Sequence, residues 1–233
     1  MLDTDRNRLL ERCSLFCGLP TATLDHITRA VQPITIKQGK VLFRRGDTVN
    51  GCYTIFSGAM KVSRFEENDK ETFLAIVGVG DIIGEIGLVD RKPRSATVTA
   101  LCDCELGLLS LRDFERLAME NSEVYRYLLV SLCARMRETN ETVRTRDFSL
   151  CYRLSQIFLQ LIDKFGVSLP DGRILINQKI TQTELGSMAG FSREIVNRQL
   201  SKWRKAQLIS KISGFYCMSD VPSWQKLCSE QET

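Results

Sequence analysis

The sequence predicts an α+β protein built from an N-terminal β jelly roll, one long helix and a C-terminal winged helix-turn-helix. Short β-rich runs with glycines between them fill residues 31–110, a pattern typical of small antiparallel barrels and jelly rolls. A heptad pattern over residues 125–143 predicts the long helix. Two helical patterns on either side of Gly190 predict the helix-turn-helix.

Length and composition fit a protein with two domains. With 233 residues the chain can bury two separate cores, and 43% hydrophobic and 26% charged residues are ordinary values. No apolar run approaches the roughly 20 residues that cross a bilayer, and the charged N-terminus lacks a signal-peptide core. We therefore expect a cytoplasmic protein with no membrane partner. The odd count of nine cysteines makes a disulfide framework unexpected.

The first part of the chain, residues 1–120, is expected to hold the jelly roll. A helical pattern over residues 5–31 comes first and is interrupted by Gly18, Leu19 and Pro20. The strands that follow are short and rich in β-branched and aromatic residues; they are expected at 41–43, 52–56, 60–62, 73–77, 96–100 and 106–109. Glycine-rich turns between so many short strands indicate a small antiparallel roll.

The second part, residues 121–147, is expected to form a dimerisation helix and a hinge. Its seam alternates steps of four and three residues; the seam residues are Tyr125, Leu129, Leu132, Met136, Thr139 and Val143. Because the chain has one such helix, the simplest partner is a second copy, so the pattern predicts a parallel homodimer. The alternative is that the stripe packs against the jelly roll of its own chain.

Two polar residues mark the seam. Thr139 lies in it and Asn140 follows directly. A polar seam residue can fix the register of two paired helices. It can also reach a polar ligand beside the dimer axis, and the residues alone leave both roles open.

The third part, residues 148–233, is expected to hold the DNA-binding element. A helix over 149–165 comes first, with Asp147 or Ser149 as its N-cap. Residues 180–204 then carry the helix-turn-helix, in which the positions expected in the core are Leu185, Met188, Ile195, Val196 and Leu200. A small β-wing is expected after the second helix, from Gly214 and the three residues that follow it.

The second helix of this motif is expected to enter the major groove, with Ser192 as its N-cap. Arginine can fork onto guanine and glutamate can accept a hydrogen bond from cytosine, so the residues that project from the core can read bases. Lysines farther along the helix suit phosphates. The candidate DNA-binding residues are Thr181, Gln182, Ser192, Arg193, Glu194, Asn197, Arg198 and Lys202.

The excess positive charge lies in this third part. Residues 151–233 carry eleven Lys/Arg and seven Asp/Glu, whereas residues 1–150 carry twenty-one of each. A local basic surface suits a polyanion such as double-stranded DNA. The alternative is a structural helical hairpin whose charges are only solvated, but the glycine turn, the cap and the core spacing together favour DNA binding.

The segment from Gly84 to Val98 joins a carboxylate and a guanidinium nine residues apart, with small residues beside each. A cyclic nucleotide needs this combination, because Glu85 can accept from the ribose hydroxyl while Arg94 forks onto the cyclic phosphate. Small residues let backbone N–H groups approach the same phosphate. The alternative is a β-turn with a surface ion pair. The candidate ligand-binding residues are Gly84, Glu85, Ile86, Arg94, Ser95, Thr139 and Asn140.

The G-E-x-x-L…R-[ST]-A-x-V segment, the seam helix and the R-E-x-V-x-R helix together resemble the CRP/FNR family of bacterial transcription regulators, over roughly residues 12–217. The likeness is greatest to the cyclic-AMP-responsive branch. It implies that Gly84 and Glu85 contact the ribose, that Arg94 and Ser95 contact the phosphate, and that Thr139 contacts the adenine amino group. That branch has a serine, contributed by the other protomer, where this chain has Asn140.

The resemblance also implies the partners. The effector is expected to be cyclic AMP, with cyclic GMP as the alternative, and RNA polymerase is an expected partner beside the homodimer and DNA. Arg193, Glu194 and Arg198 match the base-reading residues of the family. They imply an inverted repeat with TGTGA-like half-sites.

Cys13 and Cys17 support a rival interpretation, in which the same scaffold senses redox state through an iron–sulfur cluster. Their spacing lacks a third nearby cysteine, and the complete Glu85–Arg94 segment favours a nucleotide. A regulator that has lost its dependence on a ligand is another alternative. We expect no resident cofactor, no metal site and no enzyme activity, because the chain has one histidine and no evident pairing of a nucleophile with a base.

Overall fold

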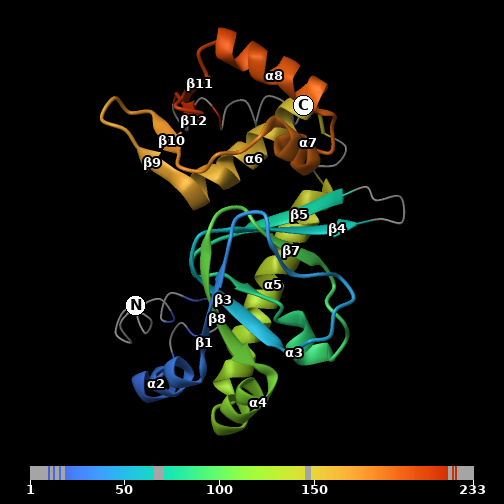
Figure 1. Cartoon of the computed structure of the whole chain (residues 1–233), viewed down its shortest axis with the longest axis vertical. Helices are drawn as coiled ribbons and strands as arrows, with labels where there is room; N and C mark the ends of the chain where they lie inside the picture. The colour runs from blue at the N-terminus through green and yellow to red at the C-terminus, as the bar shows by residue number, and fades with distance from the viewer. Residues whose placement is uncertain are drawn as a thin grey trace. The chain divides into compact units, whose positions relative to one another are not determined.

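The computed structural model describes residues 19–65, 71–144 and 148–219, together with Leu10, Cys13, Phe16, Pro222 and Trp224. Within these ranges the side chains of residue 135 and of residues 138–144 are not described. The chain divides into two compact units, which we call the N-terminal unit (Met1–Arg64 with Ala75–Thr139) and the C-terminal unit (Phe65–Leu74 with Asn140–Thr233). Figure 1 shows the elements of both along the blue-to-red course of the chain.

The predicted jelly roll is confirmed as two four-stranded antiparallel sheets. The first sheet has the order β1-β8-β3-β6; its strands are β1 (Gln32–Ile36), β8 (Cys104–Ser110), β3 (Gly51–Ser57) and β6 (Ile82–Ile83). The second has the order β2-β7-β4-β5; its strands are β2 (Val41–Phe43), β7 (Thr97–Ala100), β4 (Met60–Phe65) and β5 (Glu71–Val77). Strand β3 is buried along almost its whole length, so it forms the centre of the roll.

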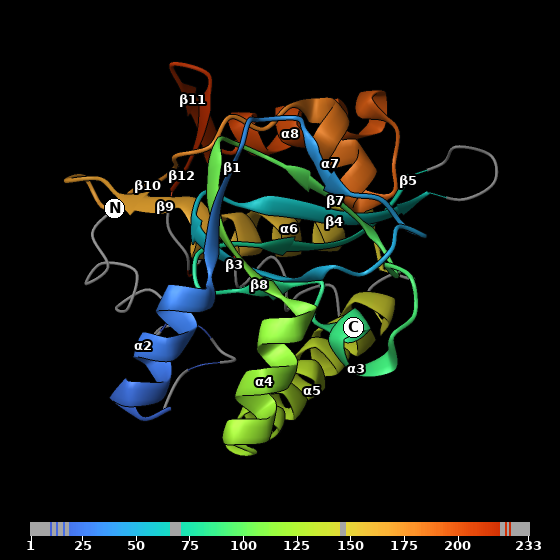
Figure 2. The same cartoon turned by 60° about the horizontal axis from the view of Figure 1, so that its bottom comes forward.

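Helices cover one end of the roll. They are α2 (Thr21–Ala30), α4 (Leu111–Glu120) and α5 (Glu123–Arg144), and Figure 2 shows them on the same side of the strands. Helix α4 begins where β8 ends, because the Ser110 hydroxyl accepts a hydrogen bond from the N–H of Asp113. Phe114 and Leu117 of α4, Ile27 of α2 and Leu128 of α5 belong to one buried apolar cluster. This cluster fixes the start of the long helix against the jelly roll.

The two faces of α5 differ. Val124 and Leu128 are fully buried in the apolar cluster. The seam residues Tyr125, Leu129 and Met136 are 46%, 59% and 67% exposed in the single chain. The predicted stripe is therefore only partly free of the jelly roll. Leu129 and Met136 are exposed, whereas Leu132 is partly buried against the cluster and the ring of Tyr125 meets Phe114 edge-on, with 5.8 Å between the ring centroids.

The C-terminal unit has the predicted helix-turn-helix and wing. Its helices are α6 (Leu150–Phe165), α7 (Gln182–Ala189) and α8 (Arg193–Lys205). A four-stranded sheet of order β11-β12-β10-β9 accompanies them; its strands are β9 (Gly166–Ser168), β10 (Ile174–Ile176), β11 (Ile209–Ile212) and β12 (Phe215–Met218). Phe158 lies at the centre of an aromatic core, with ring contacts to Trp203, Tyr216 and Trp224. Ser149 caps α6, one of the two predicted caps.

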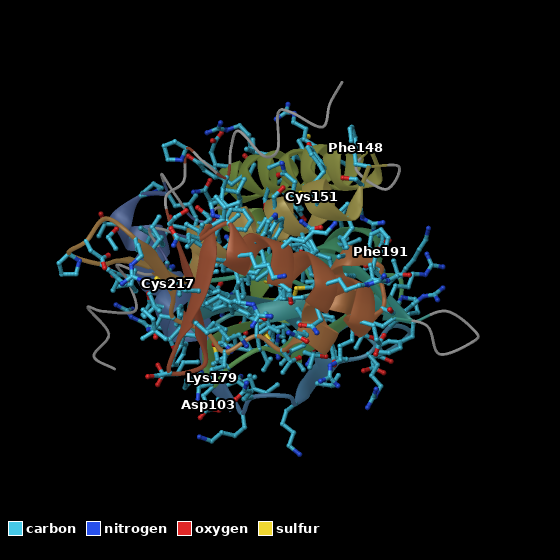
Figure 3. The ribbon with its side chains drawn as sticks, turned by 90° about the horizontal axis from the view of Figure 1, so that it is seen from above. Asp103, Phe148, Cys151, Lys179, Phe191 and Cys217 are labelled. Carbon is cyan, nitrogen blue, oxygen red and sulfur yellow. The ribbon has the colours of Figure 1, made fainter. Side chains whose placement is uncertain are left out.

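The turn between α7 and α8 depends on Gly190. Its φ of 72° is left-handed, and a Cβ there would lie 2.7 Å from Nη2 of Arg153. The same arginine covers the ring of Phe191 at 5.1 Å, a residue labelled in Figure 3. Within the described part of the chain, none of the helices is both apolar enough and long enough to cross a lipid bilayer.

Candidate functional site

Arg94 is the centre of the predicted ligand site, and it is only 4% exposed. Its Nη1 donates to the carbonyl of Gly84 at 2.9 Å. Its Nη2 donates to Oδ1 of Asn50 at 2.7 Å and to the carbonyl of Gly51 at 2.8 Å. The guanidinium also lies over the ring of Phe43, 4.3 Å from its centroid. Protein groups thus hold the cation in one place before any ligand arrives.

Three of the five N–H donors of Arg94 are used, so two are left over, one of them on Nε. Its Nε is buried and has no hydrogen-bond partner among the described residues. Arg94 borders a cavity of about 40 Å³, and Glu85, which is 1% exposed, borders it too. Buried polar groups are normally hydrogen-bonded, so a spare buried N–H on a cation beside a cavity indicates an anionic ligand.

Burial and neighbouring charges act on Arg94 in opposite directions. Burial lowers the pKa of its guanidinium, while Tyr53, Cys52 and Glu85 raise that pKa and offset part of the effect. Arginine stays protonated under such shifts, so the site keeps a positive charge. Burial raises the pKa of the Cys52 thiol, and Cys13 and Glu85 raise it further. The Cys52 thiol beside the site is therefore neutral.

Glycines let the backbone approach the guanidinium. Gly84 has a left-handed φ of 81°, and a Cβ at this position would collide with Nη1 of Arg94. Gly87, in the short helix α3 (Ile86–Asp90), lies so close to Val49 that a side chain there would collide as well. The sequence suggested that small residues let backbone N–H groups approach a phosphate; what the structure shows is that Gly84 leaves space for the guanidinium and Gly87 leaves space for Val49.

Five of the seven predicted ligand-binding residues line this cavity. Glu85 and Arg94 are buried, Gly84 is partly buried, and Ile86 and Ser95 are exposed at its edge. The other two, Thr139 and Asn140, lie on α5, but their side chains fall outside the described residues.

The residues that hold Arg94 were not among the predicted ones. Asn50 bonds to Arg94 and also to the hydroxyl of Tyr53, at 3.1 Å from its Nδ2. Phe43 stacks on the guanidinium from β2. These three residues precede Arg94 by more than forty positions, and no local spacing links them to it.

The predicted DNA-reading residues project from α8 as expected. Val196, Leu200 and Trp203 bury one side of this helix. The other side carries the exposed residues Arg193, Glu194, Asn197, Arg198 and Lys202. The side chain of Gln182, at the start of α7, donates from Nε2 to Oδ1 of Asn197 at 3.0 Å. This bond ties the two helices of the motif together on their exposed side.

The N-cap residue of α8 is the predicted one, Ser192, but its side chain makes no capping hydrogen bond and so does not cap the helix. A backbone N–H, followed by the Ser192 hydroxyl, lowers the pKa of the Glu194 carboxyl through hydrogen bonds, so Glu194 competes for the capping role. Thr181 instead caps α7 in a complete capping box with Glu184, at 3.1 and 2.7 Å.

The cysteines of the rival interpretation are described only in part. Cys13 is fully buried, and its sulfur lies 3.9 Å from Oγ1 of Thr54. Cys17 falls outside the described residues. Cys104 donates to the carbonyls of Cys102 and Ala59, at 3.2 and 3.4 Å. No group of three or more potential metal ligands forms among the residues that the structure describes.

Known proteins match both parts of the chain. The cyclic nucleotide-binding domain family matches residues 33–121, and the Crp-like helix-turn-helix domain family matches residues 152–228. The cAMP-activated global transcriptional regulator CRP of Escherichia coli is 33% identical over 172 residues, covering 72% of this chain and 80% of the relative. A CRP-like cAMP-activated global transcriptional regulator of Mycobacterium tuberculosis is 27% identical over 196 residues, covering 84% and 87%.

Solved structures show the same fold. A transcriptional regulator of the CRP/FNR family from Thermus thermophilus has a TM-score of 0.72 at 20% identity, covering 86% of this chain and 100% of that one. In this chain the cyclic nucleotide-binding domain precedes the helix-turn-helix domain. The Escherichia coli relative is 33% identical to this chain, and the match covers 80% of that relative. The chain belongs to the CRP/FNR family of transcription regulators, which combine a cyclic nucleotide-binding domain with a DNA-binding domain and are not enzymes.

Proposed function

We propose that this protein is a homodimeric regulator that binds cyclic AMP and recognises an inverted repeat with TGTGA-like half-sites. Residues 1–120 take the effector, residues 121–147 join two copies, and residues 148–233 bind the DNA. Cyclic AMP is the proposed effector because the relatives from Escherichia coli and Mycobacterium tuberculosis are named as cAMP-activated. As in other transcription regulators, RNA polymerase is the further partner. The protein acts where the DNA is, which fits a cytoplasmic location.

The observation that carries the effector proposal is the buried Arg94 with a spare N–H beside a small cavity. A phosphate oxygen would accept from this donor and meet the positive charge. Glu85, which lines the same cavity, would accept from a ribose hydroxyl. Thr139 and Asn140 are the residues proposed to contact the base.

The dimer proposal rests on the exposed seam of α5. Tyr125, Leu129 and Met136 are apolar and at least 46% exposed in the single chain. They repeat with the spacing at which two long helices pair. A second copy would cover all three with the same residues of its own α5.

The DNA proposal rests on the side chains of α8. Arg193 and Arg198 would each recognise a guanine, and Glu194 a cytosine, as in the family. A homodimer related by two-fold symmetry presents this helix twice. The two half-sites must then form an inverted repeat with their centres about one helical turn apart.

Isothermal titration with cyclic AMP and cyclic GMP tests the effector proposal. We expect the protein to bind cyclic AMP more tightly than cyclic GMP. In Arg94→Leu the phosphate would be desolvated without a counter-charge, so binding should fall by about 3–5 kcal/mol, more than a hundredfold. The control is Lys92→Leu, which removes an exposed cation from the same loop and should leave binding unchanged.

The outcome of the titration separates the alternatives. Binding by Arg94→Leu within threefold of the parent would show that the segment does not bind the phosphate. Tighter binding of cyclic GMP would show that cyclic GMP is the effector, and the proposed ligand site would still stand. An absence of binding to either nucleotide would favour a regulator that works without a nucleotide.

A further inference from the structure

A second small cavity lies in the C-terminal unit, between α7, α8 and the β11–β12 hairpin. Its volume is about 50 Å³, and its lining includes Gln182, Arg204, Lys211 and Tyr216. Tyr216 directly precedes Cys217, which Figure 3 labels on β12. The described residues that line this cavity include two cations and no carboxylate. Its electrostatics therefore favour an anion.

The hydroxyl of Tyr216 indicates that a ligand is missing. The residue is 3% exposed, and its hydroxyl is buried with no hydrogen-bond partner within the described ranges. Burial raises the pKa of Tyr216 to about 12, and the charge of Arg204 offsets only part of this, so the hydroxyl keeps its proton at neutral pH. It is a hydrogen-bond donor at the wall of a cationic cavity, and buried donors of this kind are normally satisfied.

The two cations have donors to spare. The ammonium of Lys211 lies 4.4 Å from the ring centroid of Tyr216. Arg204 donates hydrogen bonds from Nε to the carbonyl of Leu200 at 3.4 Å and from Nη2 to Oγ of Ser201 at 3.1 Å. A guanidinium carries five N–H donors, so three remain for a ligand.

We propose that this cavity holds one phosphate group of the DNA backbone, bound by Lys211, Arg204 and the hydroxyl of Tyr216. The inference rests on the DNA binding of the helix-turn-helix domain. The cationic lining and the small size of the cavity suit a compact anion such as a phosphate group. Gln182 borders the cavity and also bonds to Asn197 on the exposed side of α8, so a phosphate here lies next to the base-reading residues.

Such a contact would have a defined effect on recognition. Phosphate contacts fix the register and orientation of a protein on the duplex without reading its sequence. This phosphate would hold the C-terminal half of α8 and the wing at one distance from the groove. The arginines near the start of α8 would then meet the same base pairs in each complex.

Fluorescence anisotropy with the full-length protein tests the proposal on two duplexes, one with the inverted repeat and one scrambled. Lys211→Ala should weaken both by the same factor and reduce the slope of log K against log salt by about 0.9. Tyr216→Phe should weaken both without changing the slope, because it removes a neutral donor. Its melting temperature should not fall, because the deleted hydroxyl makes no bond within the described ranges. Arg173→Ala, which removes a cation bonded to Asp171 at 2.6 Å, is the control.

Neutral methylphosphonate, placed at one backbone position at a time, locates the phosphate. At one position the methylphosphonate should weaken DNA binding by the parent protein and by Arg173→Ala. At the same position it should have almost no further effect on binding by Lys211→Ala. The proposal is overturned if no such position exists, or if Lys211→Ala and Tyr216→Phe bind both duplexes like the parent while Arg193→Ala loses the specific one. DNA binding would still stand in that case.

Two further outcomes are decisive. In the first, inorganic phosphate stabilises the parent against heat more than chloride does at equal ionic strength, and does not stabilise Lys211→Ala, while DNA affinity stays unchanged. That result would assign the cavity to a free anion and overturn the proposal. In the second, Arg193→Ala, Lys211→Ala and Tyr216→Phe all bind DNA like the parent. The DNA-binding role of α8 then fails, and the proposal fails with it.

Discussion

Gly84 shows how a single residue shapes the effector site. Its carbonyl accepts from Arg94, and its lack of a side chain leaves space for the guanidinium. The position also has a left-handed φ of 81°, which costs an L-residue about 1–2 kcal/mol. Glycine is therefore needed here for two separate reasons: the space that the guanidinium occupies and the left-handed backbone conformation.

Gly84→Ala should therefore lower both the free energy of unfolding and the affinity for the nucleotide. We expect it to unfold at lower urea than the parent and to lose nucleotide affinity, because the new Cβ displaces Arg94. Gly39→Ala is the matched control: its φ is 75°, but no atom lies within 4 Å of a Cβ there. It should lose a similar part of the unfolding free energy and keep nucleotide binding. Equal nucleotide affinity in the two variants would contradict the role of Gly84.

Cys102 has an unusual thiol for this chain. The neighbouring side chain of Cys104 lowers the pKa of the Cys102 thiol to about 6, while the pKa of Cys104 is raised by the same contact and by burial. Cys102 is partly exposed, whereas Cys104 is buried. The thiolate is the nucleophile, so an exposed thiol with a low pKa reacts at neutral pH.

Alkylation by iodoacetamide, followed by mass spectrometry, checks this assignment. The rate at Cys102 should rise as pH increases through about 6 and level off above pH 7, because deprotonation is then complete. Cys133, an exposed cysteine on α5, is the comparison within the same chain. In Cys104→Ala the midpoint at Cys102 should move to higher pH. A profile at Cys102 that is unchanged in this variant would rule out the contact with Cys104.

At the scale of elements, α5 has one face buried in its own chain and another face that carries the exposed part of the seam. Val124 and Leu128 pack against the jelly roll, while Leu129 is 59% exposed on the seam. Leu129→Glu should convert the proposed dimer to a monomer in analytical ultracentrifugation, because a carboxylate at a helix–helix seam would be buried without a partner. Met119→Glu is the control, since Met119 is 86% exposed and belongs to a different helix, α4. A dimer that persists in Leu129→Glu would show that this seam is not the interface.

The start of helix α8 is expected to read bases, and residues farther along it are expected to contact phosphates. Arg193→Ala should lower affinity for the inverted repeat by about 1–3 kcal/mol and relax the preference at one base pair. Lys202→Ala should weaken all sequences alike and flatten the salt dependence, because it loses a phosphate contact. Selection from random DNA, repeated with each variant, measures both effects. A selected site that does not change with Arg193→Ala would rule out base reading by this residue.

The sequence predicts most elements because their signals are local. The six expected strands, the long helix, the helix-turn-helix and the wing all appear near their predicted positions. Strands β1, β6 and β9 were not predicted. Pro33 obscures the pattern of β1, β6 has two residues, and the three residues of β9 follow directly on α6. Short strands such as these are recognised by their pairing, which a local pattern does not contain.

The same limit applies to the effector site. Gly84, Glu85 and Arg94 lie within eleven consecutive residues, so their shared role was readable. Asn50, Tyr53 and Phe43 contact Arg94 only because the jelly roll brings their strands and turns together. Ser192 is the N-cap residue of α8 as predicted, but its side chain makes no capping hydrogen bond, and a carboxylate two positions later competes for that role.

At the scale of the whole molecule, the proposal requires that two sites influence each other. A ligand shifts a protein between states only by its different affinity for them. Cyclic AMP would favour the DNA-competent state, and Thr139 on the α5 seam is the residue proposed to report its presence to both copies. Linkage is reciprocal, so DNA must raise the affinity for cyclic AMP by the same factor.

One titration tests this central claim most directly. A labelled duplex with the inverted repeat is titrated with the protein, with and without saturating cyclic AMP, and its fluorescence anisotropy is recorded. We expect the Kd for DNA to fall at least about tenfold with the nucleotide, a coupling of about 1.4 kcal/mol. In Arg94→Leu the nucleotide should have no effect. An identical Kd with and without cyclic AMP, in a parent protein that binds both ligands, would contradict the account.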